Sequence, residues 1–315
     1  MINLKLNIIP FREFWLDCYS TAIYSILLSK TNIDKIFIYQ NNYIYKESRI
    51  DFPDKSVVWS IMPQSDMKVM TERILENIKY VDFKEKDNPI FILKSLLRRE
   101  QIIFLGVDIY YWISDNFNWH RNHFNHYSLL NGFNDEKKSF YVLETGNVGY
   151  KEYEISEEEL LLALKSFSGE TSMIAKLNYN AGQCDYDKKE FIINAKNIIS
   201  SIDEIINKKN MLLVSDNVTK EKHHIILDHV QTHLYGMESR QRANCLLISN
   251  LCKINQKHIY IDRFNQLQRN YATLKNLVLS HNIKESYIEL SDIRNEIIQC
   301  LLREKEIWLD IIREE

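Results

Sequence analysis

The spacing of apolar and polar residues divides the chain into a mixed first part and a helical last third. Residues 18–29 carry apolar or aromatic side chains at positions 19, 22, 23, 26 and 27, which is the spacing of one helix face. Asp17 stands immediately before them, and aspartate is a favoured N-cap residue. The sequence therefore predicts a helix that begins at Cys18.

The other elements expected in the first part are short. The expected helices are residues 67–80, a helix that starts at Asn88-Pro89 and ends near residue 100, and residues 160–166 behind a capping box at 156–159. The expected strands are residues 36–39 and 43–45 around a turn, 102–107, and a hairpin of 127–133 with 139–143.

The apolar signal weakens between residues 178 and 187, which indicates a domain boundary. Five later segments have a helical period: 188–207, 225–235, 241–252, 263–280 and 290–313. Arg240 and Arg242 are expected to be charges on a helix surface. We therefore expect an α+β domain over residues 1–180 and a helical domain over residues 181–315.

Composition and charge exclude several classes of function. The 315 residues include 40 Lys plus Arg against 43 Asp plus Glu, a balance that argues against a nucleic-acid partner. No apolar run reaches the ~18 residues of a membrane span, and the start lacks the pattern of a signal peptide, so we expect a cytoplasmic protein without a membrane partner. With 7 glycines, the chain has no glycine-rich phosphate-binding motif.

Cys18 is the first candidate catalytic residue. Exposed backbone N–H groups and the helix dipole favour a thiolate at a helix start, and the thiolate is the nucleophilic form of cysteine. The five cysteines are odd in number and irregularly spaced, so we expect free thiols. The other cysteines are expected to be structural: Cys184, Cys245, Cys252 and Cys300.

The predicted hairpin adds a base and an acid. His126 begins its first strand and Glu144 ends its second, so the two side chains are expected side by side in a cross-strand pair. A carboxylate can then hold one imidazole nitrogen while the other faces a thiol. The pattern predicts a triad of Cys18, His126 and Glu144.

These segments resemble a known family. Asp17-Cys18-Tyr19-Ser20, the run from His126 to Asp135 and Tyr141-Val142-Leu143-Glu144 are similar to the papain-like fold of the C39 peptidase superfamily. Residues 106–111 (GVDIYY), an aromatic loop and then His126 resemble the butirosin-pathway acyltransferase family, whose members also carry a helical C-terminal part. The amide-forming enzyme of polythioamide biosynthesis is similar as well. The resemblance is specific over residues 14–30 and 104–145.

The resemblance implies acyl transfer. Members of the family move an acyl group from the phosphopantetheine thioester of an acyl carrier protein to a cysteine and then to a small-molecule amine, forming an amide in natural-product biosynthesis. No bound cofactor and no metal are expected. Two positions depart from the family: Glu144 replaces the usual aspartate, and Arg12 stands where peptidases of the superfamily place an oxyanion-stabilising glutamine. Arg12 could donate to an oxyanion or be a surface residue, and the backbone N–H of Cys18 is the safer donor.

The segment before His126 offers candidate substrate-binding residues. Asp108, a position that is characteristically aspartate in the family, binds substrate or caps a turn. Tyr111 and Trp112, with residues 117–119, line a dry acyl pocket or pack as a hydrophobic loop. His120 and His123 lack the converging ligands of a metal site.

Two alternatives to acyl transfer remain open at this stage. A cysteine hydrolase, either peptidase or thioesterase, would use the same triad and let water reach the acyl-enzyme. A non-catalytic binding module would keep the fold, with Glu144 and Arg12 as signs of lost activity.

Overall fold

The computed structural model describes residues 2–31, 36–65, 67–116, 118–147, 149–178, 188–214, 219–251 and 256–314, without the side chain of Val69. It is an α+β protein with two compact units. The first comprises Met1–Glu13, Asp17–Ile33 and Met67–Cys184, and the second comprises Phe14–Leu16, Asp34–Asp66 and Asp185–Glu315. Segment 34–66, which the sequence placed with the first 180 residues, therefore groups with the C-terminal helices.

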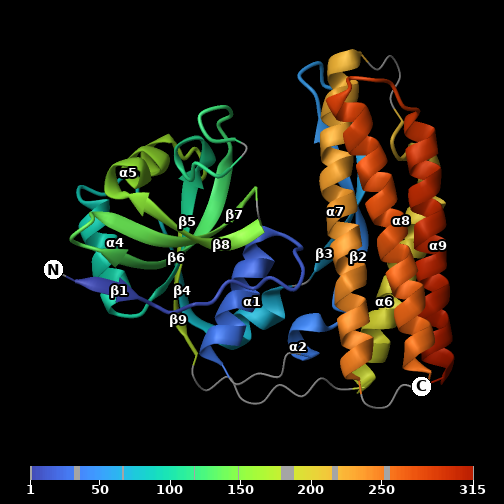
Figure 1. Cartoon of the computed structure of the whole chain (residues 1–315), viewed down its shortest axis with the longest axis horizontal. Helices are drawn as coiled ribbons and strands as arrows, with labels where there is room; N and C mark the ends of the chain where they lie inside the picture. Colours follow the sequence, from blue (N-terminus) through green and yellow to red (C-terminus); the bar gives the residue numbers. More distant parts are fainter. Residues whose placement is uncertain are drawn as a thin grey trace. The chain divides into compact units, whose positions relative to one another are not determined.

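A seven-stranded antiparallel sheet forms the centre of the first unit, with the order β4-β9-β5-β6-β7-β8 and with β1 paired to β6 (Figure 1). Its strands are β1 Asn3–Lys5, β4 Leu75–Val81, β5 Ile102–Asp108, β6 Asn125–Asn134, β7 Ser139–Gly146, β8 Gly149–Ser156 and β9 Ser172–Leu177. Every residue of β5 is buried, as expected for a central strand that is covered on both faces.

Helices cover the two faces of this sheet. The helices of the first unit are α1 Cys18–Lys30, α3 Lys68–Ile74, α4 Pro89–Arg98 and α5 Glu157–Ser166, together with the 3₁₀ turn η1 Ile109–Tyr111. Helix α1 lies on one side, and α4 and α5 lie on the other (Figure 1). The capping predictions are confirmed: Asn88 accepts a hydrogen bond from the N–H of Phe91, and Ser156 forms a capping box with Glu159.

A β-bulge sets the register of the β6–β7 hairpin. Gly132 lies opposite Tyr141, whereas Leu129 lies opposite Leu143, so the pairing shifts by one residue between Leu130 and Gly132. A one-residue shift moves a side chain to the other face of the sheet. Gly132 has φ +153°, and a Cβ atom there would lie 2.1 Å from the Leu4 carbonyl oxygen, so the bulge requires glycine.

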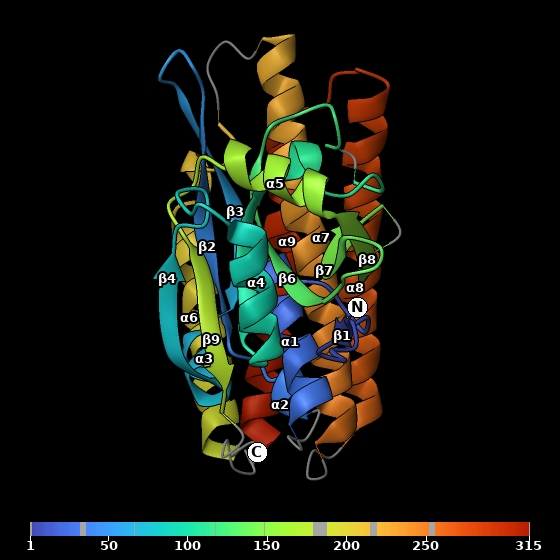
Figure 2. The same ribbon diagram turned by 90° about the vertical axis from the view of Figure 1, so that its left-hand side faces the viewer.

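The second unit combines a β-hairpin with long helices. Its elements are α2 Ile36–Tyr39, β2 Tyr43–Asp51, β3 Val57–Ser65, α6 Lys188–Asn207, the 3₁₀ turn η2 Lys209–Met211, α7 Lys220–Asn250, α8 Lys257–Ile283 and α9 Leu290–Glu314. The hairpin packs on α6 and α7, and Figure 2 shows the four long helices running side by side. No helix among the described residues has the length and apolar character needed to cross a membrane.

Three predicted elements were wrong. Residues 36–39 form the short helix α2 rather than a strand, because a four-residue apolar run does not distinguish the two. The predicted helix 67–80 ends at Ile74 and continues as β4, where pairing with β9 outweighs the helical pattern. Segments 225–235 and 241–252 are parts of the single helix α7, which runs through Gly236.

The other predicted helices and strands are confirmed, with ends that differ by up to six residues: strand 43–45 extends to Asp51 as β2, and helix 263–280 begins at Lys257 as α8. The predicted boundary between 178 and 187 is largely outside the described residues, which resume at residue 188.

Candidate active site

Cys18 lies at the first position of α1, as the sequence predicted. The Asp17 carboxylate caps the helix by accepting hydrogen bonds from the N–H and the hydroxyl of Ser20, at 2.7 and 2.6 Å. The thiol is partly exposed, and its sulfur lies 3.6 Å from the Thr145 hydroxyl oxygen. The N–H groups in a first helical turn have no intrahelical acceptor, so this position offers donors and positive partial charge beside the sulfur.

The bulge brings His126 and Glu144 to the same face of the sheet. The register after the bulge places Glu144 opposite Ser128, two residues from His126 along β6. The two side chains are therefore diagonal neighbours rather than a directly opposed pair, and their hydrogen bond joins His126 Nε2 to Glu144 Oε1 at 3.0 Å. Glu144 Oε1 also accepts a hydrogen bond from the N–H of Thr145 at 2.7 Å, which holds the carboxylate at the strand end.

The three predicted residues meet in one place. The Cys18 sulfur, a ring nitrogen of His126 and a carboxylate oxygen of Glu144 all lie within 4.8 Å of one another. The side chain of Glu144 is only 2% exposed and that of His126 is 18% exposed. The carboxylate therefore lies in a poorly solvated position where its charge acts strongly on the imidazole.

The electrostatics favour a charged imidazole. Burial lowers the pKa of His126, but the Glu144 charge and the hydrogen bonds to Cys18 and Glu144 outweigh burial and raise the pKa to about 11. His126 is therefore an imidazolium at neutral pH. A cation beside the sulfur stabilises a thiolate, which is the nucleophilic form of the cysteine.

Two neighbours of the triad had not been identified from the sequence. Thr145 follows the acid and brings its hydroxyl to the sulfur. Tyr150 is the second residue of β8 and lies opposite Thr145, and burial together with the charges of Glu144 and Cys18 raises its pKa well above the usual value. The register of β7 and β8 could have identified both, but β8 was not predicted.

The triad is also a set of possible metal ligands. Among the described residues, Cys18, His126 and Glu144 are the one group of histidine, cysteine and carboxylate side chains close enough to hold a metal ion. Zinc accepts all three ligand types. The same atoms could therefore bind zinc.

Arg12 and Asp108 lie outside this cluster. Arg12 is exposed, and no hydrogen bond or ion pair links it to the triad. Asp108 is 2% exposed and caps the turn η1. Its oxygens accept hydrogen bonds from the N–H groups of Tyr110 and Phe124, both at 3.1 Å, and one lies 2.6 Å from His123 Nδ1. Asp108 thus orders the loop that leads into His126.

The aromatic loop is an ordered stack of rings. Tyr110 stacks on His123 with ring centroids 4.2 Å apart, and Tyr111 contacts both rings edge-on. His120 lies between Tyr110 and Trp119 in the same stack. Trp112 is 1% exposed and part of the core, so the hydrophobic-packing alternative describes it. Phe117, the first residue of the predicted stretch 117–119, is outside the described residues.

The described cysteines other than Cys18 are poor nucleophiles. Burial raises the pKa of Cys245 to about 12, with a smaller contribution from Asp262, and burial raises the pKa of Cys300 to about 11. Cys184 and Cys252 fall outside the described residues. Cys18 is therefore distinguished by its position beside an imidazolium.

A comparison with models of known protein families found no match, and neither did a comparison with curated protein sequences. The case for any activity therefore depends on the chemistry of Cys18, His126 and Glu144.

Proposed function

We propose that the chain is a cysteine-dependent acyltransferase with a papain-like catalytic unit, forming an amide through an acyl-Cys18 intermediate. The observation that carries this proposal is the cluster of Cys18, His126 and Glu144 within 4.8 Å, at the start of a helix. The sulfur, the imidazole and the buried carboxylate correspond to the nucleophile, the base and the orienting group of a catalytic triad.

In the first step, the Cys18 thiolate attacks the carbonyl carbon of a thioester. The backbone N–H of Cys18, at the start of α1, has no intrahelical acceptor and can donate to the developing oxyanion. As the tetrahedral intermediate collapses, the carbon–sulfur bond of the donor breaks. The departing thiolate takes the proton from His126, which leaves acyl-Cys18 and a neutral imidazole.

In the second step, an amine attacks the acyl-enzyme. The neutral imidazole of His126 accepts a proton from the amine nitrogen, and the Cys18 thiolate leaves. An amide is formed and the imidazolium is restored. The hydrogen bond to Glu144 keeps the ring oriented in both steps and stabilises its positive charge.

The resemblance noted in the sequence supports the identity of the two substrates. The acyl donor is the phosphopantetheine thioester of an acyl carrier protein, and the acceptor is a small-molecule amine. A thioester is an activated acyl group, so neither step requires a further energy source. The product is an amide of natural-product biosynthesis, made without a bound cofactor.

The test is acyl-enzyme formation with an acyl-pantetheine thioester, followed by intact-protein mass spectrometry. The wild type should gain one acyl group, and addition of a primary amine should release it as the amide. Cys18→Ala should gain none while retaining its circular dichroism spectrum. Cys245→Ala is the matched control, because it removes a partly buried thiol that is not part of the triad, and it should acylate normally.

Other outcomes identify the alternatives. Release of free acid as the sole product, whatever amine is present, would show that the triad is a hydrolase. A wild type that never acylates while Cys18 alkylates at the rate of a free thiol would show a binding module. Turnover by Cys18→Ala would contradict every version of the proposal.

A further inference from the structure

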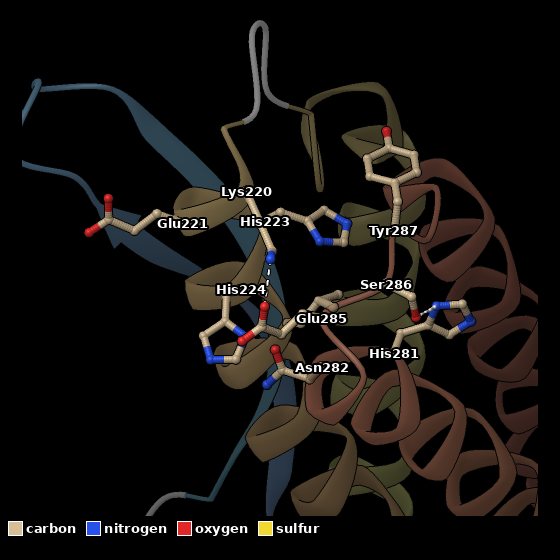
Figure 3. A pocket seen from close by; sticks show the side chains of 10 residues that line it. Lys220, Glu221, His223, His224, His281, Asn282, Glu285, Ser286 and Tyr287 are labelled. Atoms are coloured by element: carbon tan, nitrogen blue, oxygen red, sulfur yellow. Dashed lines mark hydrogen bonds and ion pairs between the residues drawn. The ribbon is translucent and has the colours of Figure 1, made fainter.

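A pocket of about 670 Å³ opens at one end of the helices in the second unit (Figure 3). Its walls are the first turns of α7, the last turn of α8 and the segment that leads to α9. This volume is within the usual range of small-molecule sites, about 300–1,000 Å³. None of its lining residues belongs to the triad, and the proposed acyl transfer does not use it.

A buried hydrogen-bond acceptor faces this pocket. Asn282 is 6% exposed, and its Nδ2 group donates a hydrogen bond to Asp228 Oδ1. Its Oδ1 atom has no hydrogen-bond partner among the described residues, and it points into the pocket (Figure 3). Buried polar atoms nearly always have a hydrogen-bond partner, so this oxygen is available to accept a hydrogen bond from a ligand.

A carboxylate lies beside this oxygen. Glu285 forms an ion pair with Lys220, at 2.5 Å, and the two side chains are 64% and 73% exposed. Exposed ion pairs of this kind contribute little to stability and exchange easily. A ligand cation can therefore share the Glu285 carboxylate with Lys220 or displace the Lys220 side chain into solvent.

The upper wall of the pocket is aromatic. Tyr287 is 62% exposed and stacks on His223, with ring centroids 4.9 Å apart. His223 Nε2 donates to the carbonyl oxygen of Ile288 at 2.8 Å, which orients the ring on which Tyr287 stacks. An exposed tyrosine ring next to acceptors is suited to a cation or an aromatic group.

The two helix ends at the pocket carry opposite partial charges, so they favour ligands of opposite charge. The last turn of α8, which contains Asn282, has partial negative charge and favours a cation. The first turn of α7 has partial positive charge, but it carries Glu221, and the side chain of Thr219 already caps the N–H of Lys222. The acceptors from α8 and the following segment therefore decide the character of the site.

We propose that this pocket binds a small organic primary ammonium ion that carries an aromatic group. The ammonium donates hydrogen bonds to Asn282 Oδ1 and the Glu285 carboxylate, and the aromatic group packs on Tyr287. This site is separate from acyl transfer and does not depend on the activity of Cys18.

The test is isothermal titration calorimetry on the full chain with 2-phenylethylamine as the probe. The matched probe is 3-phenylpropionate, which has the same ring and a negative charge in place of the positive one. We expect saturable 1:1 binding of 2-phenylethylamine and no binding of 3-phenylpropionate. Cys18→Ala should bind the amine like the wild type, which separates this result from any failure of the acyl-transfer proposal.

Four variants locate the site. Glu285→Gln should weaken binding about tenfold, and Tyr287→Ala should weaken it by a similar factor, because each removes one direct contact. Lys220→Gln should tighten binding, because it frees the Glu285 carboxylate. Glu296→Gln is the control for charge, since Glu296 is an exposed carboxylate on α9 that does not line the pocket, and its binding should be unchanged.

Three results would overturn the proposal. The first is no saturable binding of 2-phenylethylamine up to millimolar concentrations. The second is tighter binding of 3-phenylpropionate, which would make this an anion site at the start of α7. The third is amine binding that Glu285→Gln and Tyr287→Ala leave unchanged, which would locate the ligand elsewhere.

Discussion

Replacing Glu144 by glutamine should turn His126 from a histidine that is cationic at neutral pH into one that titrates near neutral pH. The Glu144→Gln variant keeps an amide oxygen at the same distance, so it can still accept the hydrogen bond of His126. What it removes is the negative charge 3.0 Å from the ring. At an effective dielectric constant of about 20, two unit charges at this distance attract by ~5.5 kcal/mol. This energy corresponds to roughly 4 pKa units.

We therefore expect the pKa of His126 to fall from about 11 in the wild type to about 7 in Glu144→Gln. The assay is a pH titration followed by NMR on protein with ring-labelled histidine. The His126 signal is identified among the 9 histidines by its absence in His126→Gln. Glu152→Gln, on the neighbouring strand β8, is the matched control and should leave His126 unaltered.

The same change alters how stability depends on pH. The pKa of His126 in the folded protein lies above its unfolded value of about 6.5, so its stabilising contribution is complete below pH 6.5 and is lost as the pH rises towards 11. Urea unfolding of the wild type should show this decline, and Glu144→Gln should not. A wild-type His126 that titrates near 6.5, or a Glu144→Gln shift below one unit, would refute the electrostatic account of the site.

Three further predictions concern other parts of the chain. Burial, with a smaller contribution from His229, lowers the pKa of His233 to about 4, so protonation of His233 on acidification should destabilise the fold. Between pH 7 and 4.5, the unfolding free energy of the wild type should fall by about 2 kcal/mol more than that of His233→Gln, as measured by urea unfolding. Glu304→Ala removes the buried carboxylate that accepts hydrogen bonds from Tyr43, Tyr45 and Gln241, and it should lower the unfolding free energy measured in urea by ~4 kcal/mol. No measurable loss would show that these hydrogen bonds do not contribute to stability. Iodoacetamide at pH 7 should label Cys18 long before Cys245 or Cys300, as followed by peptide mass spectrometry; equal labelling would contradict the proposed thiolate.

The local part of the site could be predicted from the sequence. Asp17 as a cap, Cys18 at a helix start and the hairpin that carries His126 and Glu144 all depend on neighbouring residues. The register could not be predicted, because the bulge at Gly132 depends on the approach of β1, more than 120 residues earlier in the chain. The pair that was expected to be directly opposed is diagonal, because the hairpin register places Glu144 opposite Ser128 rather than opposite His126.

Burial of a side chain by residues that are distant in the sequence was the other feature that could not be predicted. Arg240 was expected on a helix surface, yet it is fully buried. Its guanidinium donates to the carbonyl oxygens of Tyr39 and Gln40, at 3.0 and 2.6 Å, and lies 4.4 Å from the centre of the Tyr43 ring. These partners lie about 200 positions earlier in the chain, so the helical pattern around Arg240 contains no sign of them.

The β2–β3 hairpin has a practical consequence for dissecting this protein. Tyr43 and Tyr45 share the Glu304 carboxylate through their hydroxyl groups, so an early segment completes a core that otherwise comes from the end of the chain. A single cut near residue 180 would leave both fragments with exposed apolar surface and unpaired polar groups. Recombinant expression of the C-terminal helices, or their exchange between proteins, would have to include residues 36–65 as a second insert.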